Sequence, residues 1–375
     1  MNFEFSQELD MLRDQARRML AERSSIRAVR DVLEGRKPWD RALWQEMAGL
    51  GWLGAAVPER FGGVGLGHEG LCVIAEEVGR AIAPVPFTSS VSLATEALLA
   101  WGSDAQRAQW LPSLAAGERI GCFALAEGPG QPGDRAITAS LRGGRLNGSK
   151  WPVADGGIAD LAIVATRDED GTATLAIVDL TQAGVSRRSL ETIDPTREHS
   201  RLDFADVRAE PLGEGAALGW AAIARVLDRA AVLIAFEQIG IAQRCLQMAT
   251  TYAKERHAFG RPIGSFQAIK HKLADVYIAL ELARSNAYYG AWALQADAPE
   301  LPLAAASARV GATDAAQLAS KENIQTHGGM GITWEVDAHL FHRRAKLLGL
   351  AIGGNAWWKD QLVTRWGEQL QRQAA

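Results

Sequence analysis

Four side chains that can hold an anion beside a flat ring lie close together in the last third of the chain. They are Arg256, Phe259, Arg261 and Gln267, within the run YAKERHAFGRPIGSFQAIKHKLADV that starts at Tyr252. A guanidinium group binds phosphate or carboxylate through paired hydrogen bonds, and an aromatic ring offers a flat contact surface. By residue type alone, a helix hairpin with solvated arginines is the more common structure. The spacing nevertheless makes this stretch the first candidate site.

Two long helices are predicted to position these side chains. The first is expected to stop near Gly260, with Pro262 just beyond it, because neither residue continues a helix well. Ser265 is the predicted N-cap of the second helix. That helix carries one apolar face at three- and four-residue steps, made by Ile269, Leu273, Val276, Leu280, Ala283 and Ala287. The candidate site therefore lies at a tight corner between two helices.

Three stretches together resemble the acyl-CoA dehydrogenase family, in order and in separation. The first is the corner itself, from Arg256 through Phe266-Gln267 to Ala274-Asp275. The second is Gln325 to Gly331, followed by Glu335 and Arg344 to Lys346, and the third is Pro58 to Gly63. The similarity covers nearly the whole chain. It implies FAD as cofactor, an acyl-CoA thioester as substrate, and electron transfer to an electron-transfer flavoprotein.

The resemblance also assigns roles to individual residues, each of which stays an expectation here. Arg256 matches the arginine that reaches the pyrophosphate of FAD in a neighbouring subunit, and Phe259 and Gln267 match groups at that same face. Gln325, Gly328 and Gly329 match a stretch whose backbone comes close to the neighbour's cofactor. An oligomer, built from identical chains or with a homologous subunit, follows from these roles.

Other family positions are replaced. The two positions at which relatives carry the catalytic glutamate hold Ile352 and Ala230, which cannot accept a proton. The loop that contacts the flavin ring begins with Ala126 where a threonine is usual. The next strand, Lys150 to Asp155, lacks the usual Trp-x-Thr, so contacts at Ala126 and Ala154 would have to come from backbone amides.

Glu237 is the remaining candidate for the catalytic base. It follows the apolar run Val232 to Phe236, two helical turns beyond Ala230, and a glutamate in such a place is costly unless it is paired or functional. A structural glutamate paired with an arginine such as Arg244 is the competing interpretation.

Three functions stay open at this point. The chain is a self-sufficient FAD-dependent acyl-CoA dehydrogenase that uses Glu237, it is a base-less subunit of a heterotetramer that completes a partner's FAD site, or it is another flavin oxidase on the same fold. A bulky acyl group fits the second of these best.

The predicted architecture is α+β: an all-α domain at residues 1–118, a small β-barrel or sandwich domain at 119–215, and a four-helix bundle at 216–375. Helical patterning reaches about Ala116, with breaks at Gly35 to Pro38, Pro58 to Gly67 and Pro84 to Pro86. Short β-type runs follow at 120–125, 161–165, 174–178 and 201–204, with Gly143-Gly144 and Asn147-Gly148 as turns. Trp44, Trp52, Trp101 and Trp110 are expected in the core.

Composition narrows the class of protein further. The 375 residues are 47% hydrophobic with a formal net charge of -4, which does not favour a nucleic-acid binder. The start of the chain is acidic and amphipathic, unlike a signal peptide, and no apolar run is long enough to span a bilayer, so a cytoplasmic location is expected. The 3 cysteines and 7 histidines are scattered without metal-ligand spacing, and no metal site is expected.

Overall fold

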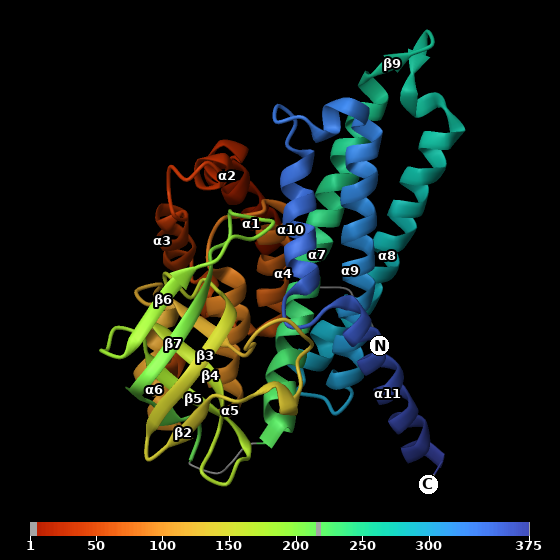
Figure 1. Ribbon diagram of the computed structural model, residues 1–375. Helices are drawn as coiled ribbons and strands as arrows, with labels where there is room; N and C mark the ends of the chain where they lie inside the picture. Colours follow the sequence, from red (N-terminus) through yellow and green to blue (C-terminus); the bar gives the residue numbers. More distant parts are fainter. Residues whose placement is uncertain (1–5, 215–218, 375) are drawn as a thin grey trace. The chain divides into compact units, whose positions relative to one another are not determined.

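The computed structural model describes residues 6–214 and 219–374 of the chain (Figure 1). Residue contacts divide it into two compact units, which are described separately. The bundle unit comprises the chain up to Val29, Cys72–Ala83, and everything from Ala231 on. The sheet unit comprises Arg30–Leu71 and Pro84–Ala230.

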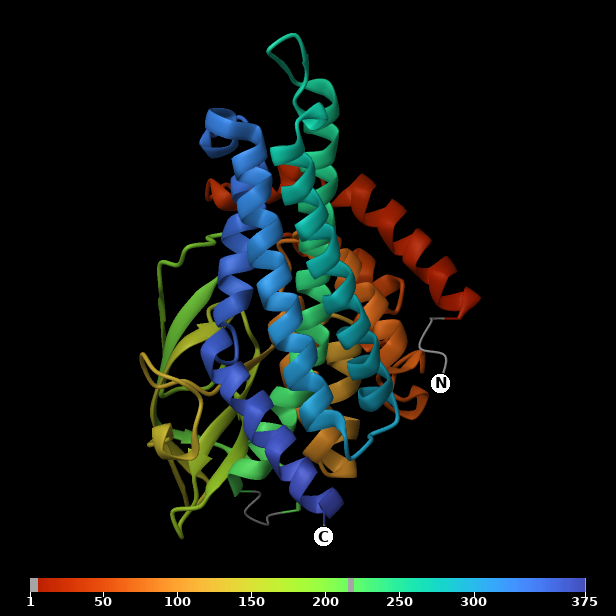
Figure 2. The same cartoon turned by 90° about the vertical axis from the view of Figure 1, so that its right-hand side faces the viewer.

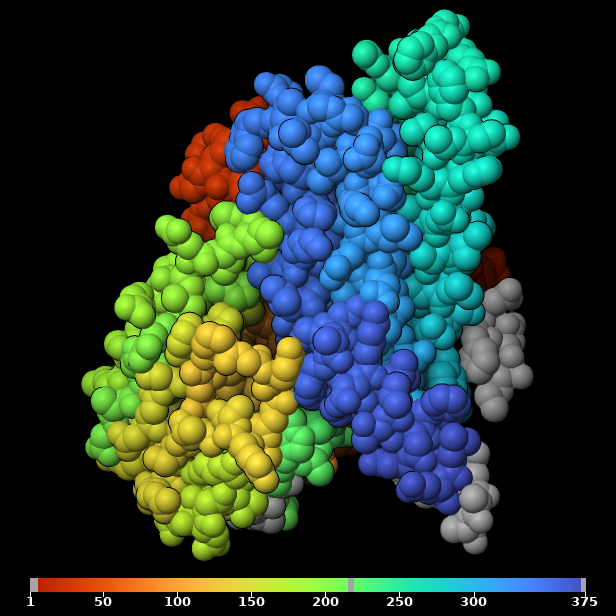
Figure 3. Space-filling view, turned by 45° about the vertical axis from the view of Figure 1, so that its right-hand side comes forward, coloured from red at the N-terminus to blue at the C-terminus, as the bar shows by residue number. Residues whose placement is uncertain are grey.

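Helices make up the bundle unit. Besides the last part of α4 (Gly67–Arg80), they are α1 (Gln7–Arg23), most of α7 (Gly219–Glu255), α8 (Gln267–Gln295), α9 (Leu301–His327), α10 (Ala338–Leu350) and α11 (Asn355–Ala374). Figure 2 shows α7, α8 and α9 running alongside one another. Gly290 allows this close packing, because a Cβ added there would lie 3.3 Å from Val232 on α7 and 3.4 Å from Ala308 on α9. Figure 3 shows α9, α10 and α11 side by side on one face.

The start of α8 differs from its prediction. Its N-cap is Phe266, which makes no side-chain cap hydrogen bond. Ser265 instead ends the short 3-10 turn Ile263–Ser265, and its hydroxyl donates to Pro262 O at 2.7 Å. The tight turn takes the serine out of the cap position by satisfying its hydroxyl locally.

The sheet unit contains a mixed sheet in the order β6-β7-β3-β2-β4-β5-β8, with β1 paired in parallel to β4. The strands are β1 (Gly121–Ala124), β2 (Ser140–Arg142), β3 (Arg145–Ala154), β4 (Leu161–Arg167), β5 (Ala173–Asp179), β6 (Val185–Ser189), β7 (His199–Arg208) and β8 (Glu210–Pro211). The helices of this unit include α2 (Ile26–Leu33) in part, α3 (Arg41–Gly49), α5 (Glu96–Trp101) and α6 (Asp104–Ala115). Between α4 and α5 the chain forms a buried π-helix, η3 (Phe87–Thr95). The helix, sheet, helix succession confirms the predicted α+β fold.

Two local predictions in this unit are wrong or incomplete. Asn147 and Gly148 lie within β3 and do not form a turn. The pairing of β3 with β7 shifts register between Leu146 and Gly148. Gly148 has φ +139°, and a Cβ would lie 2.7 Å from the Ala139 side chain, so glycine is needed for a bulge. Trp101 is only half-buried, with its indole N–H donating to Ala222 O at 3.0 Å, whereas the other three predicted tryptophans are buried.

The predicted domain boundaries stay a prediction. The boundary at residues 215–216 lies outside the described residues. None of the described helices is long and apolar enough to cross a membrane.

Candidate functional site

The corner between α7 and α8 is a short, hydrogen-bonded turn. Ile263 N donates to Arg256 O at 2.8 Å, and β9 (His257–Ala258) pairs with β10 (Arg261–Pro262). Figure 2 shows this turn at one end of the bundle. Phe259 sits at its tip with φ +53° and 95% of its surface exposed. An aromatic side chain so exposed on a strained backbone is expected to meet another molecule.

The polar residues of the corner differ in what they contact. The Arg261 guanidinium lies 4.2 Å from the centre of the Phe266 ring and is held there by a cation–π contact. Arg256 and Gln267 are exposed, and within the described part of the chain the Arg256 side chain makes no hydrogen bond or ion pair. Arg256 is therefore available to an anion from outside the chain.

The glycine-rich segment after α9 lies at the same end of the bundle as the corner (Figures 1 and 2). The stacking of Tyr252 on His327, with ring centres 4.2 Å apart, joins the last turns of α7 and α9. Gln325 is exposed, and the chain then enters the 3-10 helix η6 (Gly328–Ile332).

The glycines of η6 are of two kinds. A Cβ built on Gly328 or Gly329 meets no atom within 4 Å, but Gly328 has φ +60°, a backbone conformation that favours glycine, whereas Gly329 has no such requirement. A Cβ on Gly331 would lie 2.4 Å from Ile324 O, so that glycine serves internal packing. Gly328 and Gly329 thus leave open space for a ligand or neighbour to approach the backbone.

The two family positions for the catalytic base provide no proton acceptor. Ala230 is fully buried on α7, and Ile352 follows α10 with φ +53°. Glu237 has no exposed surface, and its negative charge acts on Arg309 of α9. The arginine on which the Glu237 charge acts is thus Arg309, which sequence spacing did not suggest.

Ala126 and Ala154 belong to the sheet unit, where the side chains near them are already engaged. Ala126 O accepts from Trp151 N at 2.7 Å, and Ala154 pairs with His199 across β3 and β7. The neighbouring Glu127 carboxylate accepts from Ala139 N at 3.0 Å and from Lys150 Nζ at 2.6 Å. Only backbone groups of Ala126 and Ala154 can take part in binding a ring.

A buried charge cluster in the sheet unit was missed from the sequence. Glu96 is fully buried, with Arg229 Nε donating to it at 2.8 Å and with His68 Nε2 lying 3.0 Å from its Oε1. Burial by itself raises the pKa of Glu96, but the charges of His68 and Arg229 and their hydrogen bonds lower it to about 2. A glutamate within the apolar run LATEALLA was the available signal.

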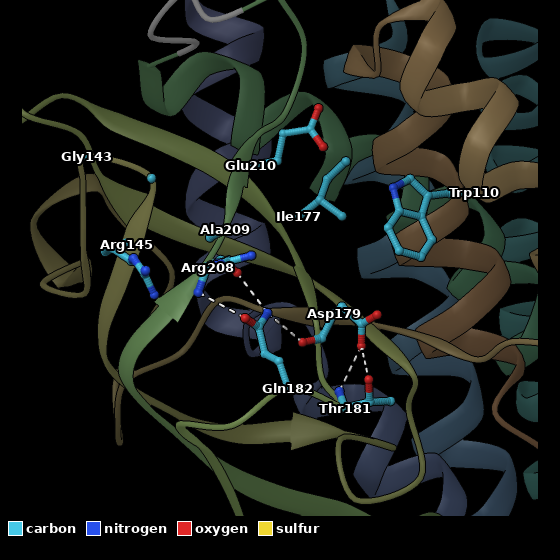
Figure 4. Close-up of a pocket in the computed structure, with 11 residues that line it drawn as sticks. Trp110, Gly143, Arg145, Ile177, Asp179, Thr181, Gln182, Arg208, Ala209 and Glu210 are labelled. Atoms are coloured by element: carbon cyan, nitrogen blue, oxygen red, sulfur yellow. Dashed lines mark hydrogen bonds between the residues drawn. The ribbon is translucent and has the colours of Figure 1, made fainter.

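An open hollow in the sheet unit contains none of the predicted site residues (Figure 4). It has a volume of about 610 Å³ between α6, the β2–β3 hairpin and the ends of β5 and β7. Its polar groups largely bind one another: Gln182 Nε2 donates to Asp179 O at 2.9 Å and to Arg208 O at 2.8 Å. Within the described residues no group of His, Cys, Asp or Glu side chains is arranged to hold a metal ion.

Two family models match the N-terminal and C-terminal parts of the chain. Residues 6–118 match the family described as acyl-CoA dehydrogenase, N-terminal domain, and residues 217–365 match acyl-CoA dehydrogenase, C-terminal domain. The acyl-CoA dehydrogenase IpdE2 of Mycobacterium tuberculosis is 36% identical over 343 residues, 90% of this chain and 91% of that protein. The chain belongs to the acyl-CoA dehydrogenase family.

Two solved structures are similar to this chain over almost their whole length. A variant of the Tcur3481-Tcur3483 steroid ACAD is 32% identical with a TM-score of 0.88, covering 97% of this chain and 99% of that chain. The ChsE4-ChsE5 complex from Mycobacterium tuberculosis is 27% identical with a TM-score of 0.88, covering 99% of each. Members of the family are oxidoreductases that use FAD and act on the CH–CH bond of an acyl-CoA.

The residues of this chain fit FAD unequally. The exposed Arg256 and the open space at Gly328 and Gly329 suit the diphosphate of FAD. The segments at Ala126 and Ala154 offer no side-chain hydroxyl or amide to the flavin ring. The chain thus keeps groups suited to the diphosphate and lacks side chains suited to the flavin ring.

Proposed function

We propose that this chain is one subunit of a two-chain, FAD-dependent acyl-CoA dehydrogenase and that it completes the FAD site of its partner. The observation that carries the proposal is the separation just described. Arg256 is exposed and makes no ion pair among the described residues, while Ile352 and Ala230 leave both base positions without a carboxylate. A self-sufficient enzyme needs a carboxylate of its own at the reacting carbon.

FAD, when bound, accepts the hydride removed from the acyl-CoA. The chain's own residues then have binding roles. Arg256 pairs with the diphosphate oxygens of the partner's cofactor, and Gln325, Gly328 and Gly329 bring the backbone close to it. Phe259 and Gln267 border the same face. The proton next to the thioester carbonyl is removed by a carboxylate of the partner.

The similar structures support a bulky acyl group as substrate. One is named a steroid acyl-CoA dehydrogenase and the other is a complex of two differently named chains. We therefore propose a CoA thioester of a sterol-derived or similarly bulky acid, oxidised in the cytoplasm with an electron-transfer flavoprotein as acceptor.

The self-sufficient enzyme with Glu237 as base is the alternative that the experiment must separate. Glu237 has no exposed surface, which places a large desolvation cost on a role in proton transfer with substrate. The flavin oxidase alternative also needs a carboxylate near residue 352.

The test compares the chain purified alone with the chain co-purified with a family member that has a carboxylate at a base position. The visible absorption of oxidised flavin is recorded before and after an acyl-CoA is added. We expect little flavin and no bleaching for the chain alone, and both for the complex. A yellow isolated chain that is bleached by an acyl-CoA would establish the self-sufficient enzyme instead.

A further inference from the structure

Arg309 lies at the centre of a hydrogen-bond network inside the bundle unit. It has no exposed surface, and its Nη1 donates to Gln238 Oε1 of α7 at 2.5 Å. Thr313 Oγ1, one turn further along α9, donates to the same oxygen at 3.2 Å. These contacts fix the guanidinium between α7 and α9.

The other terminal nitrogen of Arg309 holds the end of α10. Its Nη2 donates to Leu348 O and, at 2.9 Å, to Ala351 O. Carbonyls in the last turn of a helix lack partners within the helix, and a cation near them is favourable. Arg309 therefore acts as a side-chain cap for α10.

The residue after this cap is strained. Ile352 has φ +53°, a conformation that a β-branched side chain adopts only when its surroundings impose it. The preceding carbonyl, Ala351 O, is one of the two to which Arg309 donates. The hydrogen bond and the strained residue are thus adjacent along the chain.

Arg309 also needs a counter-charge, because an isolated buried cation is costly. Burial lowers the pKa of Arg309 and the charge of the equally buried Glu237 raises it, with a net pKa of about 9. Glu237 and Gln238 are successive residues of α7, so one helix segment supplies both the charge and the amide oxygen.

We infer that Arg309, anchored on Gln238, is a buried positioning residue that holds residues 348–352 in place with Ile352 in its left-handed conformation. The equally buried Glu237 contributes negative charge to its surroundings. The inference rests on the proposed function in one respect only, which is that position 352 is a family position for the catalytic base. Its argument otherwise uses contacts within this chain.

The test measures hydrogen exchange of the backbone amides of residues 348–354 in the full chain. Arg309→Met and Arg309→Lys should each raise the exchange rate there by about ten-fold or more, because Met has no donor and the single nitrogen of Lys cannot take the places of both terminal guanidinium nitrogens. Glu237→Gln should act in the same direction by removing the counter-charge. Arg309→Lys also provides a milder variant should Arg309→Met not fold.

Arg284→Met is the matched control. Arg284 makes another part-buried ion pair in the same unit, with its Nη1 2.7 Å from Glu76 Oε1. Losing that pair should lower Tm without a selective effect on residues 348–354. Equal exchange in these residues for the Arg309 and Arg284 variants would overturn the inference.

Rescue by a second substitution separates positioning from general stability. Glycine adopts a positive φ without strain, so Ile352→Gly in the Arg309→Lys background should return the exchange of residues 348–354 towards the native rate. Failure of this rescue would overturn the positioning role. Neither measurement requires flavin or a partner, so the outcome is independent of the proposed function.

Discussion

At the scale of single residues, side-chain contacts separate two exposed arginines of the same corner. The Arg261 guanidinium is stacked on Phe266, whereas the Arg256 side chain makes no hydrogen bond or ion pair among the described residues. The same residue type therefore has a structural role at one position and an available charge at the other.

Replacing Arg256 should weaken flavin retention in the functional complex. Arg256→Gln removes a charge-assisted contact, and we expect a loss of about 1.5–3 kcal/mol in FAD binding with Tm almost unchanged. FAD released on dilution is measured by fluorescence. Arg261→Gln is the control and should retain flavin. Equal flavin content in the Arg256 variant and the wild type would show that Arg256 is a solvated helix-end residue that does not bind the cofactor.

Glu96 should make the chain sensitive to acid. Its folded-state pKa of about 2 is below its ordinary value, so the stabilisation is present above the unfolded pKa and is lost as pH falls towards 2. The difference corresponds to about 3 kcal/mol. Glu96→Gln should therefore destabilise the chain at neutral pH and flatten the fall in unfolding free energy between roughly pH 5 and 2. Parallel urea titrations of the two proteins across this range check it; curves that stay parallel would contradict the assignment.

At the scale of elements, the 3-10 helix η6 after α9 contains glycines that are needed for different reasons. Gly331 avoids a clash with Ile324 O, whereas Gly329 has open space around its Cα. Gly331 thus packs against the bundle, whereas a Cβ built on Gly329 would meet no atom of the described residues within 4 Å.

Alanine substitutions should separate these demands. Gly331→Ala should lower Tm, because the new methyl group meets backbone that cannot move aside. Gly329→Ala should leave the Tm unchanged and reduce flavin retention in the complex. Calorimetry and flavin content are measured on both variants. If Gly329→Ala retained all its flavin, the close approach of a cofactor to this backbone would be disproved.

Features set by neighbouring residues can be predicted from the sequence, whereas contacts between residues far apart in the chain cannot. Gly260 and Pro262 interrupt the helical pattern, so the corner was predictable. The contact of Arg309 with Ala351 O joins α9 to the end of α10, and no spacing rule brings them together. The short strand β2 was likewise missed, because three residues carry too little pattern and its pairing with β3 and β4 defines it.

At the scale of the whole molecule, α8 carries apolar side chains on its exposed face. Tyr277, Ile278 and Leu282 are each more than half exposed, which is costly for a helix that meets only water. A bundle surface of this kind is expected to be covered by another subunit, in keeping with the roles proposed for Arg256 and Gly329.

The chain should therefore form a dimer or a larger oligomer through its bundle. Leu282→Glu should shift light-scattering mass towards the monomer, because it places a charge within the apolar contact. Lys270→Gln, on the exposed surface of the same helix, should leave the mass unchanged. A wild-type chain that is monomeric at micromolar concentration, alone and with its partner, would rule out the assembly.

Catalysis is also a property of the assembly, because the proton acceptor and the diphosphate contact belong to different chains in the proposed enzyme. The chain alone should not dehydrogenate straight-chain acyl-CoAs, since a base must come within about 2.6–3.2 Å of the proton and position 352 offers only a hydrocarbon side chain. In the complex, Glu237→Gln should lower stability more than the turnover of the folded fraction. Ile352→Glu is the substitution most suited to create activity in this chain once flavin is bound. Turnover by the isolated wild-type chain that survives Glu237→Gln would mean that the reacting carboxylate lies elsewhere, because neither family position nor Glu237 would then supply it.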